Sequence, residues 1–239
     1  MESAPEFTSP VVGDSLPYSV DRHAAPIGRP EAVVLQVDSS VSSIDGLEWL
    51  ASRRDSGTLN RLVALRREAA EQRWGWAELT RARLKQLRPR RAEINELGAA
   101  YLAALTEGVI DAVAALRRAG IAVALASDVG AEALFGVATA LGVSPNELYA
   151  PRLRFDAIGA FVSCDLNSAR ADDEVDVTGV RSGSARLRTL YVGTKRSAVF
   201  APRATDAFVA FSGVDTRESP SDALATLSSF HDLPALVLR

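Results

Sequence analysis

The residues best placed for chemistry are Gln36, Asp38 and Ser39, which follow a short apolar run at residues 32–35. This run is rich in β-branched side chains, which is typical of a strand buried on both faces of a parallel sheet. In open α/β sheets, ligands bind in the crevice beyond the carboxyl ends of the strands. We therefore expect these side chains and Ser40 to face a ligand. The alternative is that they only cap the following helix.

The composition is that of a water-soluble globular protein, with 47% hydrophobic residues, 24% charged residues and a net charge of -3. The charge gives no reason to expect a nucleic-acid partner, and no apolar run is long enough to cross a membrane. The single Cys164 rules out an internal disulfide and fits a reducing cytoplasm, where we place the protein. Two histidines, His23 and His231, are too few for histidine metal sites or Ser-His-Asp triads.

The order of predicted elements indicates a central α/β domain with an inserted helical segment. Residues 1–30 contain scattered prolines and no periodicity, so we expect a flexible arm, with docking on a partner as the alternative. Residues 31–50 and 100–239 form the core, and residues 51–99, dense in helix-forming residues, form a cap. Strands that alternate with helices predict a doubly wound parallel sheet. The later predicted strands are residues 121–126, 190–192, 207–211 and 235–238, with a hairpin around Gly159.

Five motifs follow one another in a defined order. They are the strand end at Asp38, the acidic helix start at Asp45, the strand end at Ser127, residues 148–155 with the hairpin behind them, and residues 206–211. In this order they resemble the haloacid-dehalogenase (HAD) superfamily, and within it the phosphoserine phosphatases. The resemblance implies a HAD-like, Rossmann-like α/β core with a small helical cap inserted after the first strand.

The resemblance also implies which catalytic groups have changed. In such phosphatases an aspartate attacks phosphorus, a lysine holds the phosphate and carboxylates bind magnesium. Gln36 occupies the nucleophile's place, and a carboxamide is neither a competent nucleophile nor a good magnesium ligand. Ser184 stands at the lysine's position, with Arg186 two residues on. The magnesium motif is Gly193-Thr194-Lys195-Arg196-Ser197-Ala198, in which both acids are replaced. We expect no metal and no cofactor, and we keep Lys195 and Arg186 as candidate anion-binding residues.

Other family positions are retained. Asp38 keeps the position of the acid/base aspartate, and we take it as the candidate catalytic residue because a carboxyl in a desolvated cleft can titrate near neutral pH. Ser39 and Ser127 keep polar strand ends and, with Gln36, are candidate substrate-binding residues.

Four further residues complete the candidate substrate site, each with a structural alternative. Asp45 stands where the family binds the substrate's amino group, but it can equally be a helix N-terminal charge. Arg83 matches the arginine that binds the substrate carboxylate, but its arginine-rich surroundings also fit a solvated helix face. Trp74 and Trp76 suggest an apolar pocket roof, whereas the ordinary interpretation is packing within the cap.

Two hypotheses remain open from the sequence. The first is a repurposed, metal-independent enzyme in which Asp38 acts as acid or base on a small organic substrate, as in a cyclisation, elimination or isomerisation. The second is a non-catalytic pseudophosphatase that binds a ligand or a protein. We favour the enzyme, because the excess of arginine over lysine and the abundant alanine indicate a high-GC bacterium and a setting in specialised biosynthesis. We expect a small-molecule ligand, carboxylate-bearing if Arg83 binds it, no nucleic-acid or membrane partner, and we allow for a homodimer.

Overall fold

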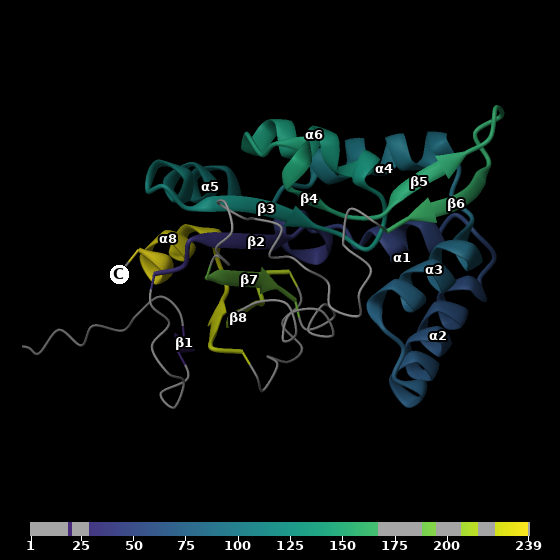
Figure 1. Cartoon of the computed structure of the whole chain (residues 1–239), viewed down its shortest axis with the longest axis horizontal. Coiled ribbons are helices and arrows are strands. Elements are labelled where there is room, and N and C mark those ends of the chain that lie inside the picture. The colour runs from purple at the N-terminus through teal and green to yellow at the C-terminus, as the bar shows by residue number, and fades with distance from the viewer. Residues whose placement is uncertain (1–18, 21–28, 167–187, 195–206, 215–222, 239) are drawn as a thin grey trace, which may run out of the picture.

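The computed structural model describes residues 19–20, 29–166, 188–194, 207–214 and 223–238. A seven-stranded sheet forms the centre of the molecule (Figure 1). Its strands are β1 (Ser19–Val20), β2 (Ala32–Gln36), β3 (Ala122–Ala126), β4 (Leu148–Tyr149), β7 (Thr189–Gly193), β8 (Ala207–Phe211) and β9 (Ala225–Leu227). They lie in the order β1-β9-β8-β7-β2-β3-β4, and all are parallel except β1, which pairs antiparallel with β9. The sheet confirms the predicted α/β architecture.

Strand β2 lies in the interior of this sheet, between β3 and β7. Gln36 is in register with Ala126 of β3, and Leu35 is in register with Val192 of β7. Because the three strands are parallel, their carboxyl ends meet at one edge of the sheet. The residues that follow Gln36, Ala126 and Gly193 therefore lie close together.

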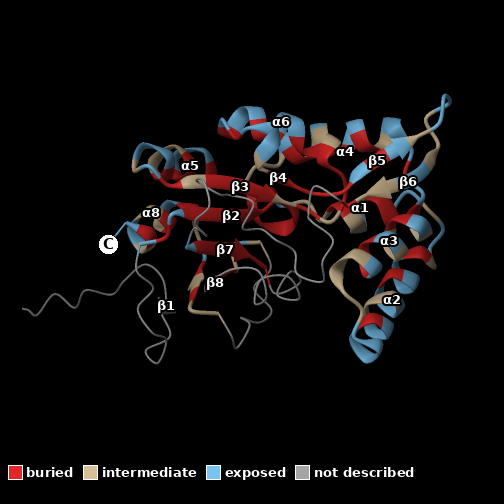
Figure 2. Ribbon diagram, viewed as in Figure 1, coloured by how far each residue is buried: buried red, intermediate tan, exposed pale blue. Residues whose placement is uncertain are grey.

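Helices α4 (Arg91–Ala103), α5 (Val109–Arg118) and α6 (Ala131–Leu141) cover one face of the sheet (Figures 1 and 2). Alternate strand residues such as Val33 and Leu35 point into the main buried core on this side, while Val34 belongs to a separate buried cluster. Helix α6 follows β3 and packs along α4. It ends at Gly142, whose φ of +66° suits glycine.

The inserted segment consists of α1 (Gly46–Ala51), α2 (Thr58–Gln72) and α3 (Trp76–Leu87). Helices α2 and α3 pack against each other, and α3 also contacts β6 of the hairpin formed by β5 (Arg152–Phe155) and β6 (Phe161–Asp165). The returning helix α4 packs along α6, and the cap boundary predicted at residue 99 falls inside α4.

The chain leaves and re-enters the core along one short antiparallel contact. Ser42 forms a β-bridge with Leu105, and the backbone N–H groups of Ser43 and Thr106 donate to the carbonyls of Ala104 and Val41 at 3.0 and 2.9 Å. Residues 43–104 therefore form a loop that main-chain hydrogen bonds close.

Two expectations need correction. Residues 235–238 do not form a strand: residues up to Val237 lie in α8 (Leu233–Val237), which begins with Pro234 in its first turn, a favoured place for proline. Within the predicted N-terminal arm, Ser19–Val20 form β1, while residues 1–18 and 21–28 lie outside the described part. Of the helices that the structure describes, none has both the length and the apolar character needed to span a bilayer.

Candidate functional site

An irregular helical turn at residues 37–41 follows β2 and positions the site. Asp38 has extended backbone angles (φ −62°, ψ 122°), and Ser39 is left-handed (φ 57°, ψ 20°). The N–H of Ser39 donates to the carbonyl of Ile44 at 2.9 Å, which ties the turn to the start of the inserted segment. A left-handed conformation costs a non-glycine residue about 1 kcal/mol, so the surrounding structure must hold this turn in place.

The turn places the carboxylate of Asp38 among three hydrogen-bond donors. Its Oδ1 accepts from the N–H of Gly46 at 3.0 Å and from the hydroxyl of Tyr101, and its Oδ2 accepts from the hydroxyl of Ser127 at 2.6 Å. Asp38 is only 7% exposed. Each carboxylate oxygen has two lone pairs. Among the described residues Oδ2 accepts from Ser127 alone, so Oδ2 keeps one lone pair without a hydrogen bond.

Burial dominates the electrostatics of this cluster. It raises the pKa of Asp38 above its ordinary value, and the neighbouring Asp45 raises it further, while the bonds from Ser127, Tyr101 and Gly46 act in the opposite direction. Burial and the charge of Asp38 also hold the pKa of Tyr101 well above its usual range. The phenol therefore stays protonated as a donor, and Asp38 binds a proton more readily than an exposed aspartate.

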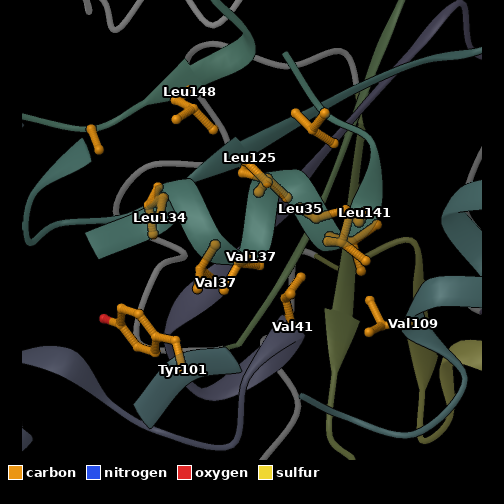
Figure 3. Close-up of a cluster of buried hydrophobic side chains, with 14 of the residues drawn as sticks. Leu35, Val37, Val41, Tyr101, Val109, Leu125, Leu134, Val137, Leu141 and Leu148 are labelled. Carbon is orange, nitrogen blue, oxygen red and sulfur yellow. The ribbon is translucent and has the colours of Figure 1, made fainter. Parts of the chain in front are cut away.

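Tyr101 reaches the site from α4, and sequence reasoning missed it. The side chain is fully buried and lies at the edge of the apolar cluster, with its hydroxyl pointing away from the other labelled side chains (Figure 3). Gly46 makes room for this contact, because a Cβ there would lie 1.9 Å from the Tyr101 hydroxyl oxygen and 2.8 Å from Oδ1 of Asp38. A buried tyrosine needs a partner for its hydroxyl, which is the only signal that the sequence offered.

Gln36 is fixed across the ends of β2 and β7. Its Oε1 accepts from the N–H of Thr194 at 2.8 Å and from its hydroxyl at 3.3 Å, and both residues are buried. These neutral groups do not suit magnesium, which prefers carboxylate oxygens. Within the described ranges no three metal-binding side chains gather in one place. The predicted anion-binding residues Arg186 and Lys195, together with Ser184 and residues 196–198, lie outside the described residues.

A second group of side chains joins the cap to the end of β3. Asp128 accepts from Nε1 of Trp76 through Oδ1 and from Nη1 of Arg83 through Oδ2, both at 3.0 Å. The Arg83 side chain is 12% exposed, so the alternative of a solvated helix face is wrong. Partial burial raises the pKa of Asp128 to about 6, with Asp38 and Asp45 adding to the rise and Arg83 opposing it. The position of Asp128 after Ser127, at a strand end, could have identified it.

The remaining candidates have local roles. Asp45 caps α1 by accepting from the N–H of Glu48 at 2.9 Å, which is the role of a helix N-terminal charge, and its charge also reaches Asp38. Trp74 donates to Gln72 at 2.9 Å between α2 and α3, and no described contact brings it to Asp38 or Asp128. Ser39 is buried within the turn.

No protein-family model matches the chain, and no curated protein sequence is significantly similar to it. Solved structures do match. A phosphoserine phosphohydrolase-like protein from Francisella tularensis subsp. tularensis SCHU S4 superposes with a TM-score of 0.70 at 17% identity, covering 87% of this chain and 99% of that one. The chain has a HAD-like α/β fold. Phosphoserine phosphatase from T. onnurineus shares this HAD fold with a TM-score of 0.58 at 16% identity, covering 90% of this chain and 98% of that one.

A third match is to part of a longer protein, DsGPDH of Dunaliella salina. Its TM-score is 0.64 at 22% identity, and the match covers 87% of this chain but 36% of that one. These likenesses confirm the predicted resemblance at the level of the fold. The chemistry must be argued from this chain's own residues, because such low identities carry no residue roles with them.

Proposed function

We propose that this phosphoserine phosphatase-like HAD-fold protein has lost metal-dependent phosphoryl transfer, and that it uses the same crevice for acid–base chemistry on a small organic substrate. Asp38 is the proton-exchanging group. The observation that carries the proposal is the buried carboxyl of Asp38, held by Gly46, Tyr101 and Ser127. Their bonds fix its orientation and leave Oδ2 to face a reacting atom.

The loss of phosphoryl transfer is supported by the groups at the strand ends. Gln36 offers a carboxamide whose oxygen is already bonded to Thr194, and it has no carboxylate to attack phosphorus. Asp128 places a further acid within electrostatic range of Asp38 and Asp45. A phosphate dianion would meet three acids, and like charges repel strongly where solvent is excluded.

Acid–base chemistry is supported by three raised pKa values among neighbouring groups. Asp38, Tyr101 and Asp128 all bind protons more tightly than their exposed counterparts, and such groups gather at functional sites. Asp38 and Asp128 come from the ends of neighbouring strands, where HAD-fold proteins have their ligand crevice.

Phosphatase activity is tested with phosphoserine and p-nitrophenyl phosphate in the presence of Mg²⁺. We expect no turnover, and we expect none from Gln36→Asp, because Ser184, Thr194 and Ala198 still lack the family's charges. Turnover that a chelator abolishes and that Gln36→Ala removes would contradict the proposal.

The acid–base role is tested by incubating the protein with a bacterial metabolite extract and separating the products by chromatography and mass spectrometry. We expect a product that forms with the natural protein and not with Asp38→Asn. In parallel, ¹³C NMR of labelled aspartates should show Asp38 titrating above its ordinary value of 3.8. The same product from both proteins would rule out catalysis by Asp38.

A second candidate is a non-catalytic ligand-binding module. It is favoured by one observation: Trp76 and Arg83 of the cap donate hydrogen bonds to Asp128 of the core. These bonds hold α3 beside the end of β3 in the absence of a ligand, as suits a binding site that carries out no reaction. The product experiment separates the candidates, because a binding module gives no product although a ligand stabilises it against heat.

A further inference from the structure

Positive charge is concentrated in the inserted helical segment. Residues 51–99 contain 12 arginine and lysine residues against 6 aspartate and glutamate residues, whereas the whole chain has a net charge of -3. The rest of the chain is therefore acidic, and the overall value conceals a basic region. A separation of charge of this kind attracts anionic surfaces to one part of a molecule.

The cations of this segment fall into a paired set and an unpaired set. Three of its acids form ion pairs inside the segment, namely Glu93 with Arg54, Glu96 with Arg53 and Asp55 with Arg61. Between residues 81 and 91, by contrast, five exposed cations have no ion-pair partner among the described residues. They are Arg81, Lys85, Arg88, Arg90 and Arg91.

Three of the unpaired cations lie on or at the end of α3. Arg81 and Lys85 are four residues apart, so they share one face of the helix, and Arg88 follows at its C-cap. Helix α3 contacts β6, and the charge of Arg81 reaches Cys164 on that strand. These cations therefore lie near the β5–β6 hairpin.

The hairpin turn carries an exposed aliphatic side chain. Ile158 is 90% exposed, more than any other large hydrophobic side chain of the described residues, and Val162 of β6 is also exposed. Figure 1 shows the turn between β5 and β6 extending beyond the helices around it. Arg91 connects the turn with the unpaired cations, because its N–H donates to the carbonyl of Gly159 at 2.9 Å.

One acid lies in the same turn. The carboxylate of Asp156 accepts from the N–H groups of Ile158 and Ala160 at 3.0 and 2.8 Å. Its charge opposes the attraction of an anionic surface, but it is one charge against five unpaired cations. Its hydrogen bonds hold the turn in the conformation that exposes Ile158.

A projecting aliphatic side chain among cations suits the surface of an anionic bilayer. The side chain can enter the boundary between headgroups and acyl chains while the cations contact the headgroups. Stable attachment of this kind needs two signals, and the hairpin region has both apolar insertion and charge. A protein partner would be met by a broader buried apolar patch, whereas the apolar contribution here comes from the tip of a turn.

We propose that the hairpin turn and the unpaired cations of residues 81–91 form a docking surface for an anionic lipid bilayer, with Ile158 inserted among the headgroups. The docking goes beyond the chemistry proposed for Asp38 and does not depend on it. One aliphatic side chain and a few cations give a reversible attachment that salt weakens.

The test measures sedimentation of the full chain with two kinds of vesicle: pure phosphatidylcholine, and phosphatidylcholine mixed with an equal amount of phosphatidylglycerol. We expect binding to the mixed vesicles at low salt, loss of this binding at about 1 M salt, and no binding to pure phosphatidylcholine. Ile158→Ser should weaken binding to the mixed vesicles by at least about tenfold. Lys85→Gln should weaken it by about fivefold, the effect of one cation near the surface.

Val63→Ser and Arg67→Gln are the matched controls. Both residues are exposed, but they belong to α2, which packs against α3 on the side away from the hairpin (Figure 1). Each control should bind the mixed vesicles within about twofold of the natural protein, because neither side chain lies at the proposed contact.

Equal binding to both kinds of vesicle, or binding to neither, would overturn the inference. Binding that Ile158→Ser leaves unchanged would also overturn it, and competition by poly-L-glutamate would then identify an acidic protein surface as the partner. Circular dichroism verifies that each variant is folded, and Ile158→Thr is the second variant at the turn. The titration of Asp38 tests the proposed function separately.

Discussion

Asp38 receives its hydrogen bonds from three segments that are far apart in sequence. The contact with Tyr101 spans 63 residues and that with Ser127 spans 89. The proton affinity of this carboxyl therefore depends on how α4 and the end of β3 pack beside β2. We therefore expect a substitution at any of the three donors to change the pKa of Asp38.

Tyr101→Phe tests this dependence. The variant removes one donor to the carboxylate, and because that bond lowers the pKa of Asp38, we expect the pKa to rise further. We also expect a loss of about 1.5–3 kcal/mol in unfolding free energy, the range for a hydrogen bond to a charged group. ¹³C NMR titration and urea unfolding measure the two effects. A double-mutant cycle with Asp38→Asn isolates the pair, and an unchanged or lowered pKa would contradict the expectation.

Sequence reasoning found the site residues that directly follow strands. It missed the residues that reach the site only because distant elements pack together. Asp38 and Ser127 were predicted because parallel strands end at one edge of the sheet. Tyr101 and Gly46 were not, because their roles depend on the distance between α4 and the turn after β2, which no local pattern encodes. The resemblance identified Arg83, but its partner Asp128 emerged only from the structure.

At the scale of the elements, the first residue of α1 must be glycine. We expect Gly46→Ala to lower the unfolding free energy by about 1–3 kcal/mol, since its Cβ would overlap Tyr101 and Asp38 in a packed interior. Gly75→Ala, at the N-cap of α3, is the matched control: a Cβ there meets nothing within 4 Å, so the loss should stay below about 0.5 kcal/mol. Chemical denaturation measures the unfolding free energy of both variants. Similar losses in the two would show that a Cβ at position 46 can be accommodated beside Tyr101 and Asp38.

The elements themselves were predictable where their ends carry local signals. The hairpin was predicted from Gly159, whose φ is +79°. The apolar stretch at residues 235–238 was misread, because so short a run does not distinguish a strand from a buried helical turn. The structure resolves that ambiguity by packing α8 against α5.

At the scale of the whole molecule, Asp128 makes stability depend on pH. Its pKa is raised to about 6 from an ordinary 3.8, so between these values the folded protein binds more protons than the unfolded chain. Its contribution to the unfolding free energy is therefore greatest below about pH 4 and falls as the pH rises to about 6. The raised pKa of Asp38 acts in the same direction.

Asp128→Asn should remove the part of this dependence that Asp128 causes. Between pH 4 and pH 8, we expect the unfolding free energy of the variant to gain about 2 kcal/mol relative to that of the natural protein. Urea unfolding at a series of pH values measures the difference. A constant difference across the series would show that ionised Asp128 is not destabilised in the folded state.

The overall architecture was predictable because it depends on the order of strands and helices along the chain rather than on individual side-chain contacts. Strands alternating with helices leave few arrangements of a parallel sheet, since crossover connections are right-handed. The placement of α3 against the end of β3 was not predictable, because it depends on Trp76 and Arg83 reaching a single carboxylate across the fold.

The bridge between Ser42 and Leu105 has a mechanical consequence. Main-chain hydrogen bonds at this bridge hold the two ends of the inserted loop together. They do not depend on the contact between α3 and Asp128. We therefore expect any displacement of α2 and α3 to leave the register between β2 and β3, and with it the alignment of the strand ends, unchanged.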